Sequence, residues 1–178
     1  MQADELRAIQ TPLKERYRDD PQSAVVTLTA RAALGEGVTC NVHTGRAIAA
    51  AGLHPASGGD GTVLCSGDML LEALAACAGV TMRAVATSLA IPVEGEVTAE
   101  GELDFRGTLG VARDAPVGFR SIRLRFSLDS NAEDDRIAKL IELTERYCVV
   151  LQTLNGSAAL NVDWIRTAEA GHSPASPT

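Results

Sequence analysis

The sequence is poor in aromatic residues and in cysteines. Three Phe, two Tyr and one Trp are its whole aromatic content, although 46% of the 178 residues are hydrophobic. A core must therefore be built mainly from Ala, Val, Leu and Ile, and the length suits one domain with short appendages. Four Cys are too few for the disulfide framework of a small secreted protein.

The chain also lacks a surplus of basic residues. Sixteen Lys and Arg stand against 23 Asp and Glu, which gives a net charge of −7. Without a basic cluster there is no electrostatic footprint for nucleic acid, and an acidic surface disfavours anionic membranes. We therefore expect no nucleic-acid partner and no membrane partner.

No segment is expected to direct the chain into or across a membrane. The charged N-terminal segment has no apolar stretch of the kind found in secretory signals. Asp68, Glu72 and Arg83 interrupt the longest apolar stretch, so no transmembrane helix is expected. These absences favour a cytoplasmic protein, in which a disulfide would be transient and catalytic rather than structural.

Hydrophobic periodicity predicts an α+β fold, with an antiparallel sheet packed on two central helices. Helical spacing of apolar residues covers residues 3–18, about 68–90, and 132–148, with a further helical turn at 151–154. Alternation predicts a hairpin within 23–44 and strands at 93–105, 118–129 and 157–165. We therefore divide the chain into a helical extension (1–22), one domain (23–168) and a flexible tail (169–178).

Two cysteines lie in apolar, helical segments 71 residues apart. Cys77 lies in LLEALAACAGVTMRAVA and Cys148 in TERYCVVLQTL. A buried cysteine is commonly an inert small hydrophobe. Alternatively the two thiols meet; an ionised Cys77 would then attack, and Cys148, at a helix end that keeps its pKa high, would form a disulfide with the resulting sulfenic acid. Composition and periodicity leave both alternatives open.

The stretch SGDMLLEALAACAGV, followed some 70 residues later by RYCVVLQTL, resembles the OsmC/Ohr family of thiol-dependent hydroperoxide reductases. The resemblance runs from about residue 24 to residue 164. It implies an OsmC-like fold in an intertwined homodimer that reduces organic hydroperoxides, with no metal, haem or flavin cofactor. It also implies that Cys77 is the peroxidatic cysteine, that Cys148 is the resolving cysteine, and that an external dithiol such as a lipoyl protein or thioredoxin supplies electrons.

The resemblance further assigns the acidic residue that orients an arginine over the thiolate to Asp68. Nine helical residues separate Asp68 from Cys77, which is about 13 Å along a helix axis. Asp68 would therefore serve the Cys77 of the other subunit across a two-fold axis.

The sequence departs from the family at the activating arginine. The family has it in the turn of the first hairpin, where this chain offers Glu36. Arg16 and Arg18 of the N-terminal extension are our candidates to replace it, with Arg31 and Arg46 behind them. The usual Pro-x-Ser after the second cysteine is also absent, because Val149 to Leu151 follow Cys148.

Two other groups have a functional and a structural interpretation. Glu72 shares a helix face with Arg83 and is either structural, as in an ion pair across a dimer, or a general acid for the leaving alkoxide.

Cys40 and His43 have a spacing that suggests zinc, but residues three apart on a strand point to opposite faces. Cys65 and His54, the other possible ligands, lie in separate loops. We therefore expect no metal, and the remaining rival function is a non-catalytic module of the same fold that binds a small apolar ligand.

Overall fold

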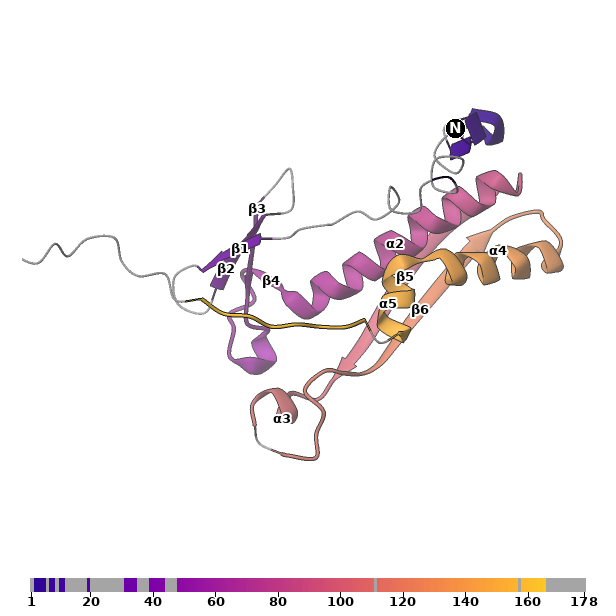
Figure 1. Ribbon diagram of the computed structural model, residues 1–178. Coiled ribbons are helices and arrows are strands. Elements are labelled where there is room, and N and C mark those ends of the chain that lie inside the picture. The colour runs from indigo at the N-terminus through magenta and orange to yellow at the C-terminus, as the bar shows by residue number, and fades with distance from the viewer. Residues whose placement is uncertain are drawn as a thin grey trace, which may run out of the picture.

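The structure is a computed structural model of the chain (Figure 1). It describes residues 48–165 except Val111 and Ser157, the strands at 31–34 and 39–43, and residues 2–5, 7–8, 10–11 and 19. Described residues between 3 and 11 are helical, in agreement with the start of the expected N-terminal helix. The rest of that helix, including Arg16 and Arg18, lies outside the described residues.

The longest element is α2 (Ser66–Ser88), which runs beside a two-stranded sheet and the later helices (Figure 1). One face of α2 is buried and consists of residues four apart: Leu74, Ala78, Met82 and Ala86. This spacing stacks side chains on one face of a helix. The expected central helix at about 68–90 is therefore confirmed.

Strands β5 (Glu94–Leu103) and β6 (Phe119–Asp129) form an antiparallel pair. Their register places Val97 opposite Phe126 and Ala99 opposite Leu124, and these side chains pack towards α2. The alternate residues, such as Glu100 opposite Arg123, are exposed. The two strands expected from alternation are confirmed, and α3 (Phe105–Thr108) lies in the loop that joins them.

Helices α4 (Asp134–Tyr147) and α5 (Val149–Asn155) pack on α2. Asp134 and Asp135 lie in the first turn of α4, where the helix dipole favours negative charge. Cys148 both ends α4 and begins α5. The expected helix at 132–148 and the further turn at 151–154 are confirmed.

A second sheet lies beyond the N-terminal end of α2 (Figure 1). Its order is β1 (Arg31–Leu34), β2 (Thr39–His43), β3 (Ile48–Gly52) and β4 (Leu64–Cys65), antiparallel except for the β3–β4 pair. The expected hairpin is present as β1–β2, while residues 23–30 lie outside the described residues. The described strands thus form two sheets rather than the single sheet expected on two central helices.

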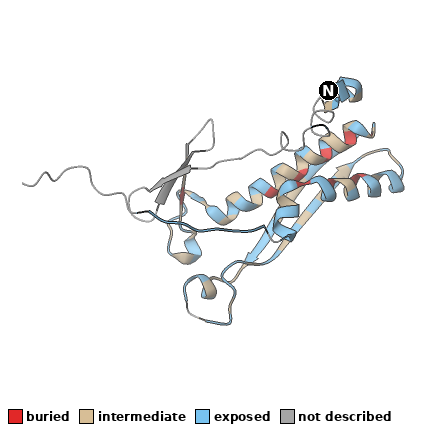
Figure 2. Cartoon of the chain, in the orientation of Figure 1, coloured by how far each residue is buried: buried red, intermediate tan, exposed pale blue. Residues whose placement is uncertain are grey.

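The strand expected at 157–165 is wrong for this chain alone. Residues 158–165 form neither helix nor strand and are exposed (Figure 2). Leu160, Val162 and Trp164 are 90%, 93% and 80% exposed. Alternation shows that a segment suits a sheet face, but a strand also needs an edge to pair with, and none of the described strands pairs with it.

The sequence predicts no transmembrane helix, but α2 is long and apolar enough to be a candidate. By length and composition it could cross a membrane, despite its three charged residues, although core helices of water-soluble proteins meet the same criterion. Much of its surface is uncovered in the single chain, with Val80 72% exposed. The helix therefore presents an apolar face that the described residues do not bury.

Candidate active site

The structure brings Cys77 and Cys148 together. Cys77 lies in the middle of α2, and Cys148 lies at the junction of α4 and α5. Leu74, Ala78 and Cys148 form a buried cluster against which Cys77 packs. Both cysteines are free thiols; Cys148 is fully buried and Cys77 is half-buried.

The environment of Cys77 favours its thiolate. Burial opposes ionisation, but the neighbouring Val150 N–H, Cys148 thiol, Thr81 hydroxyl and Val149 N–H outweigh it and lower the pKa of Cys77. These donors act because a charged acceptor forms stronger hydrogen bonds than a neutral one. Cys77 therefore combines partial access with the ionisation that a nucleophilic thiol needs.

Cys148 has the opposite character. Burial raises the pKa of Cys148, and the neighbouring Cys77 raises it further, against the N–H groups of Leu151 and Val150. The direction agrees with our expectation, but the main cause is burial rather than the end of α4. Cys148 is thus a protonated donor to Cys77 and lies where it could later react with an oxidised Cys77.

Sequence reasoning missed the backbone donors of α5. We expected a helical turn after Cys148, but not that the first N–H groups of this turn would face Cys77. The first N–H groups of a helix have no partner within it, and here those of Val150 and Val149 contribute to the lowered pKa of Cys77. The signal in the sequence is the helix that starts directly after Cys148 with no intervening loop.

Asp68 does not reach Cys77 within one chain. It lies in the first turn of α2, nine residues and therefore about 13 Å along the axis from Cys77. A hollow of about 600 Å³ lies beside it, lined among others by Cys65, Phe119 and Arg120. Asp68 itself lines this hollow and is exposed.

Among the side chains that the structure describes, no arginine contributes to the pKa shift of Cys77. Arg16, Arg18 and Arg46 lie outside the described residues, and Arg31 is placed in β1 by its backbone alone.

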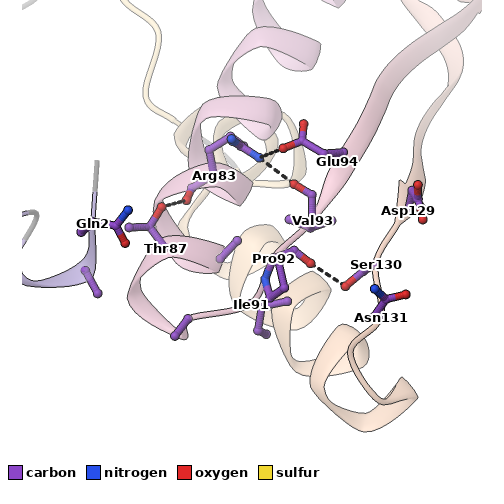
Figure 3. Close-up of a pocket in the computed structure, with 13 residues that line it drawn as sticks. Gln2, Arg83, Thr87, Ile91, Pro92, Val93, Glu94, Asp129, Ser130 and Asn131 are labelled. Carbon is purple, nitrogen blue, oxygen red and sulfur yellow. Dashed lines mark hydrogen bonds and ion pairs between the residues drawn. The ribbon is translucent and has the colours of Figure 1, made fainter.

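Arg83 is held elsewhere by partners on β5 and just before it. Its Nη1 donates to the Val93 carbonyl at 2.6 Å and lies 3.3 Å from Glu94 Oε1 (Figure 3). Glu72, which shares a helix face with Arg83, is exposed.

The surface around the thiols is apolar. Val80 lies one turn after Cys77 on α2, and Val149 follows Cys148; they are 72% and 70% exposed. Tyr147 is 57% exposed on the other side of Cys148. Exposed apolar side chains therefore lie on the elements that carry the two thiols.

Among the side chains that the structure describes, no three of His, Cys, Asp or Glu gather around a common point; those of Cys40 and His43, considered for zinc, lie outside this set. His54 Nδ1 accepts the Ala56 N–H at 3.0 Å, and its ring stacks on Phe105 at 5.0 Å. Cys65 is the residue before α2, and Cys40 and His43 lie in β2.

The fold and the two neighbouring thiols define an α+β protein with a candidate two-cysteine site. The family model described as OsmC-like protein matches residues 59–163, more than half of the chain. The chain therefore belongs to the OsmC-like family, as the resemblance of the two cysteine segments implied. Comparison with the curated proteins found no match.

Solved structures share this fold. An OsmC-like protein from Mycoplasma pneumoniae is 20% identical, with a TM-score of 0.63 over 74% of this chain and 89% of the other. An organic hydroperoxide resistance protein OsmC from Legionella pneumophila is 18% identical, with a TM-score of 0.56 over 75% and 92%. OhrB, the organic hydroperoxide resistance protein of Bacillus subtilis, is 18% identical, with a TM-score of 0.50 over 75% and 93%.

Proposed function

We propose that the protein is a thiol-dependent peroxidase that reduces organic hydroperoxides to alcohols. The observation that carries this proposal is the pairing of a half-buried Cys77 of lowered pKa with a fully buried, protonated Cys148. Membership of the OsmC-like family supports it. The names of the Legionella and Bacillus proteins of similar fold, which refer to organic hydroperoxide resistance, agree with it.

The reaction follows from the two thiol states. The Cys77 thiolate attacks the terminal peroxide oxygen, the O–O bond breaks, and the alkoxide takes up a proton and leaves as an alcohol. Cys77 is then a sulfenic acid, which condenses with the Cys148 thiol to give a disulfide and water. An external dithiol, such as a lipoyl protein or thioredoxin, reduces this disulfide by thiol–disulfide exchange.

The apolar surface near Cys77 favours organic peroxides over hydrogen peroxide. A substrate that carries an alkyl or aryl group can bury it against Val80 and Val149, which are exposed in the single chain. Burial of apolar surface contributes about 25 cal/mol per Å², and hydrogen peroxide has no such group. No step of this reaction uses a metal, haem or flavin.

A homodimer would complete both the fold and the site. In the described part of the chain β5 and β6 pair only with each other, and a two-stranded sheet is marginal on its own. The uncovered face of α2 and the exposed apolar residues at 158–165 also need a partner. A second copy, related by a two-fold axis, would cover these surfaces and bring its Asp68 to this chain's Cys77.

Burial of α2 against a second copy also explains why this helix is apolar although it does not cross a membrane. Asp68, Glu72 and Arg83 project from the helix, and charged side chains are costly in the hydrocarbon region. A cytoplasmic enzyme with a buried dimer interface is consistent with these charges, with the reducing conditions that the thiols require and with the acidic composition.

The second candidate function is a non-catalytic module that binds a small apolar ligand. The observation in its favour is that, among the described residues, no arginine acts on the Cys77 thiol. In such a module the two thiols would pack without reacting.

Titration of free thiols decides between the two functions. Wild type, Cys77→Ser and Cys148→Ser are treated with one equivalent of cumene hydroperoxide, and thiols and cumyl alcohol are counted. A peroxidase loses two thiols per chain in wild type, forms a trappable sulfenic acid in Cys148→Ser, and does neither in Cys77→Ser. Full retention of thiols at excess hydroperoxide would refute the peroxidase and leave the binding module.

A further inference from the structure

The two sulfurs of the candidate site differ in their access to solvent. Cys148 is fully buried, whereas Cys77 is half-buried. Tyr147 and Val149, on either side of Cys148 in the sequence, line a surface hollow of about 500 Å³, but Cys148 does not belong to its lining. The Cys148 side chain therefore lies on the core side of the junction between α4 and α5, away from the surface that its neighbours form.

Packing and backbone hydrogen bonds hold Cys148 in this position. Its side chain packs with Leu74 and Ala78, two buried residues of α2. Its N–H donates to the Thr144 carbonyl and its carbonyl accepts the Gln152 N–H, each at 2.9 Å. Exposure of the Cys148 sulfur therefore requires that the junction moves away from α2. Openings that expose a buried core site have a population on the order of 10⁻³ or less.

The proposed reaction itself asks for access at one sulfur only. A hydroperoxide has to reach the Cys77 sulfur from solvent, whereas Cys148 reacts with Cys77 inside the protein. An opening that admits a hydroperoxide to Cys77 also admits a thiol. Once the disulfide has formed, its Cys77 end is thus the end that an external reductant meets.

We propose that the external dithiol attacks the Cys77 sulfur of the disulfide and not the Cys148 sulfur, so that Cys77 carries the mixed disulfide with the reductant. A thiolate of the reductant bonds to Cys77 Sγ, the bond between Cys77 and Cys148 breaks, and Cys148 leaves as a thiolate that takes up a proton. The second thiol of the reductant then attacks the reductant's own sulfur, expels the Cys77 thiolate and closes the reductant's disulfide. This inference rests on the proposed function, because it names the sulfur through which the same site receives electrons.

Leaving-group chemistry alone would favour the other sulfur. Attack on Cys148 expels Cys77, whose pKa is lowered while that of Cys148 is raised, and a thiol of lower pKa leaves faster. A Brønsted slope of about 0.4–0.5 makes this advantage roughly threefold per pH unit. That factor is small beside the rarity of openings that expose Cys148, so access decides which sulfur is attacked.

The test locates the first adduct of a monothiol, which cannot complete the second step. Cys40→Ser and Cys65→Ser together remove the other two cysteines, and diamide joins Cys77 to Cys148 without a peroxide. Excess 2-mercaptoethanol is added, acid stops the exchange at early times, and mass spectrometry of the peptides locates the adduct. In the folded protein we expect at least about tenfold more adduct on Cys77 than on Cys148. In urea, where both sulfurs are exposed, the two adducts should be comparable.

Two leucine variants test whether local cover of Cys148 is the cause. Leu74 and Leu140 are both fully buried, but only Leu74 belongs to the cluster of Cys148. Leu74→Ala should raise the share of adduct on Cys148 several-fold, whereas Leu140→Ala, a truncation of the same kind in the other cluster, should leave it near wild type. An equal rise in both variants would refute local cover as the cause.

Three results in the folded protein would overturn the proposal: comparable adducts on the two cysteines, an excess on Cys148, or no disulfide between them after diamide. Cumene hydroperoxide tests the proposed function separately. If it oxidises neither thiol while the disulfide made with diamide still gives the Cys77 adduct, the peroxidase is refuted and Cys77 remains the sulfur that thiols attack. If it forms the disulfide but the adduct lies on Cys148, the peroxidase stands and this inference fails.

Discussion

Cys77 packs against Cys148, although 71 residues separate the two in the sequence. Cys148 is fully buried and its pKa is raised mainly by burial, while Cys77 is half-buried and its pKa is lowered, in part by the Cys148 thiol. The same contact therefore stabilises the thiolate of one cysteine and keeps the proton on the other. A resolving thiol that first assists the attacking thiolate is already in reach when the sulfenic acid forms.

Replacement of Cys148 should change the acid–base behaviour of Cys77. Cys148→Ala removes a donor to the thiolate, so we expect the pKa of Cys77 to rise and its alkylation to begin at higher pH. The sign follows because the lost bond stabilised only the charged form. By the usual strength of hydrogen bonds to charged groups, the shift should be on the order of one pH unit.

Cys148→Ser is the matched variant, since its hydroxyl can still donate while it cannot form a disulfide. We expect its alkylation midpoint to lie closer to wild type than that of Cys148→Ala. Alkylation of Cys77 by iodoacetamide across pH 5–9 measures the midpoints of both variants. Equal midpoints in the serine and alanine variants would show that the Cys148 proton does not act on Cys77.

The helices and β5–β6 could be predicted from the sequence because their signals are local. Apolar residues four apart define the buried face of α2, and alternation defines the apolar face of β5 and β6. The segment 158–165 has the same alternation, yet it forms no strand in the single chain. Whether alternation becomes a strand depends on an available edge, which is a property of the assembly and not of the segment.

The candidate site could be predicted only in part, for a related reason. Both cysteines lie in segments with a family resemblance, so their pairing was a natural expectation. The N–H groups of Val149 and Val150, which help to lower the pKa of Cys77, depend on where α5 begins and how it packs against α2. Backbone N–H groups carry no side-chain signature, and sequence reasoning therefore looked for an arginine and overlooked them.

The β5–β6 pair contains a glycine that no other residue should replace. Gly95 has φ of 140°, and a Cβ there would lie 2.0 Å from the Ser127 carbonyl oxygen on β6. We expect Gly95→Ala to lower the free energy of unfolding by on the order of 3 kcal/mol, since backbone strain and a steric clash add. Urea unfolding curves, analysed for midpoint and slope, measure the change.

Gly110 provides the control for this prediction. Its φ is 67°, but a Cβ there would meet nothing within 4 Å. Gly110→Ala should therefore show the backbone strain alone, about 1 kcal/mol. If Gly95→Ala and Gly110→Ala lose equal free energies of unfolding, the Ser127 carbonyl moves away at no cost. The close approach of β5 and β6 at Gly95 would then not be required.

The proposed homodimer predicts a concentration-dependent signal from Trp164. This residue is the sole tryptophan of the chain and is 80% exposed in the isolated chain. If a second copy covers residues 158–165, Trp164 emission is blue-shifted at high concentration and shifts to the red as dilution separates the chains. Analytical ultracentrifugation over the same concentrations gives the corresponding mass.

Two substitutions that introduce a charge test whether the second copy covers the apolar side of residues 158–165. Val162→Asp places a carboxylate between Leu160 and Trp164 on the apolar side of the segment. Burial of a valine side chain contributes about 1.5 kcal/mol, so its loss should weaken association of the two chains by roughly tenfold. Asn161→Asp adds the same charge on the opposite side of the alternation and should leave association nearly unchanged. A Trp164 spectrum that is independent of concentration, with a monomeric mass in wild type, would refute the dimer and with it the supply of Asp68 from a partner.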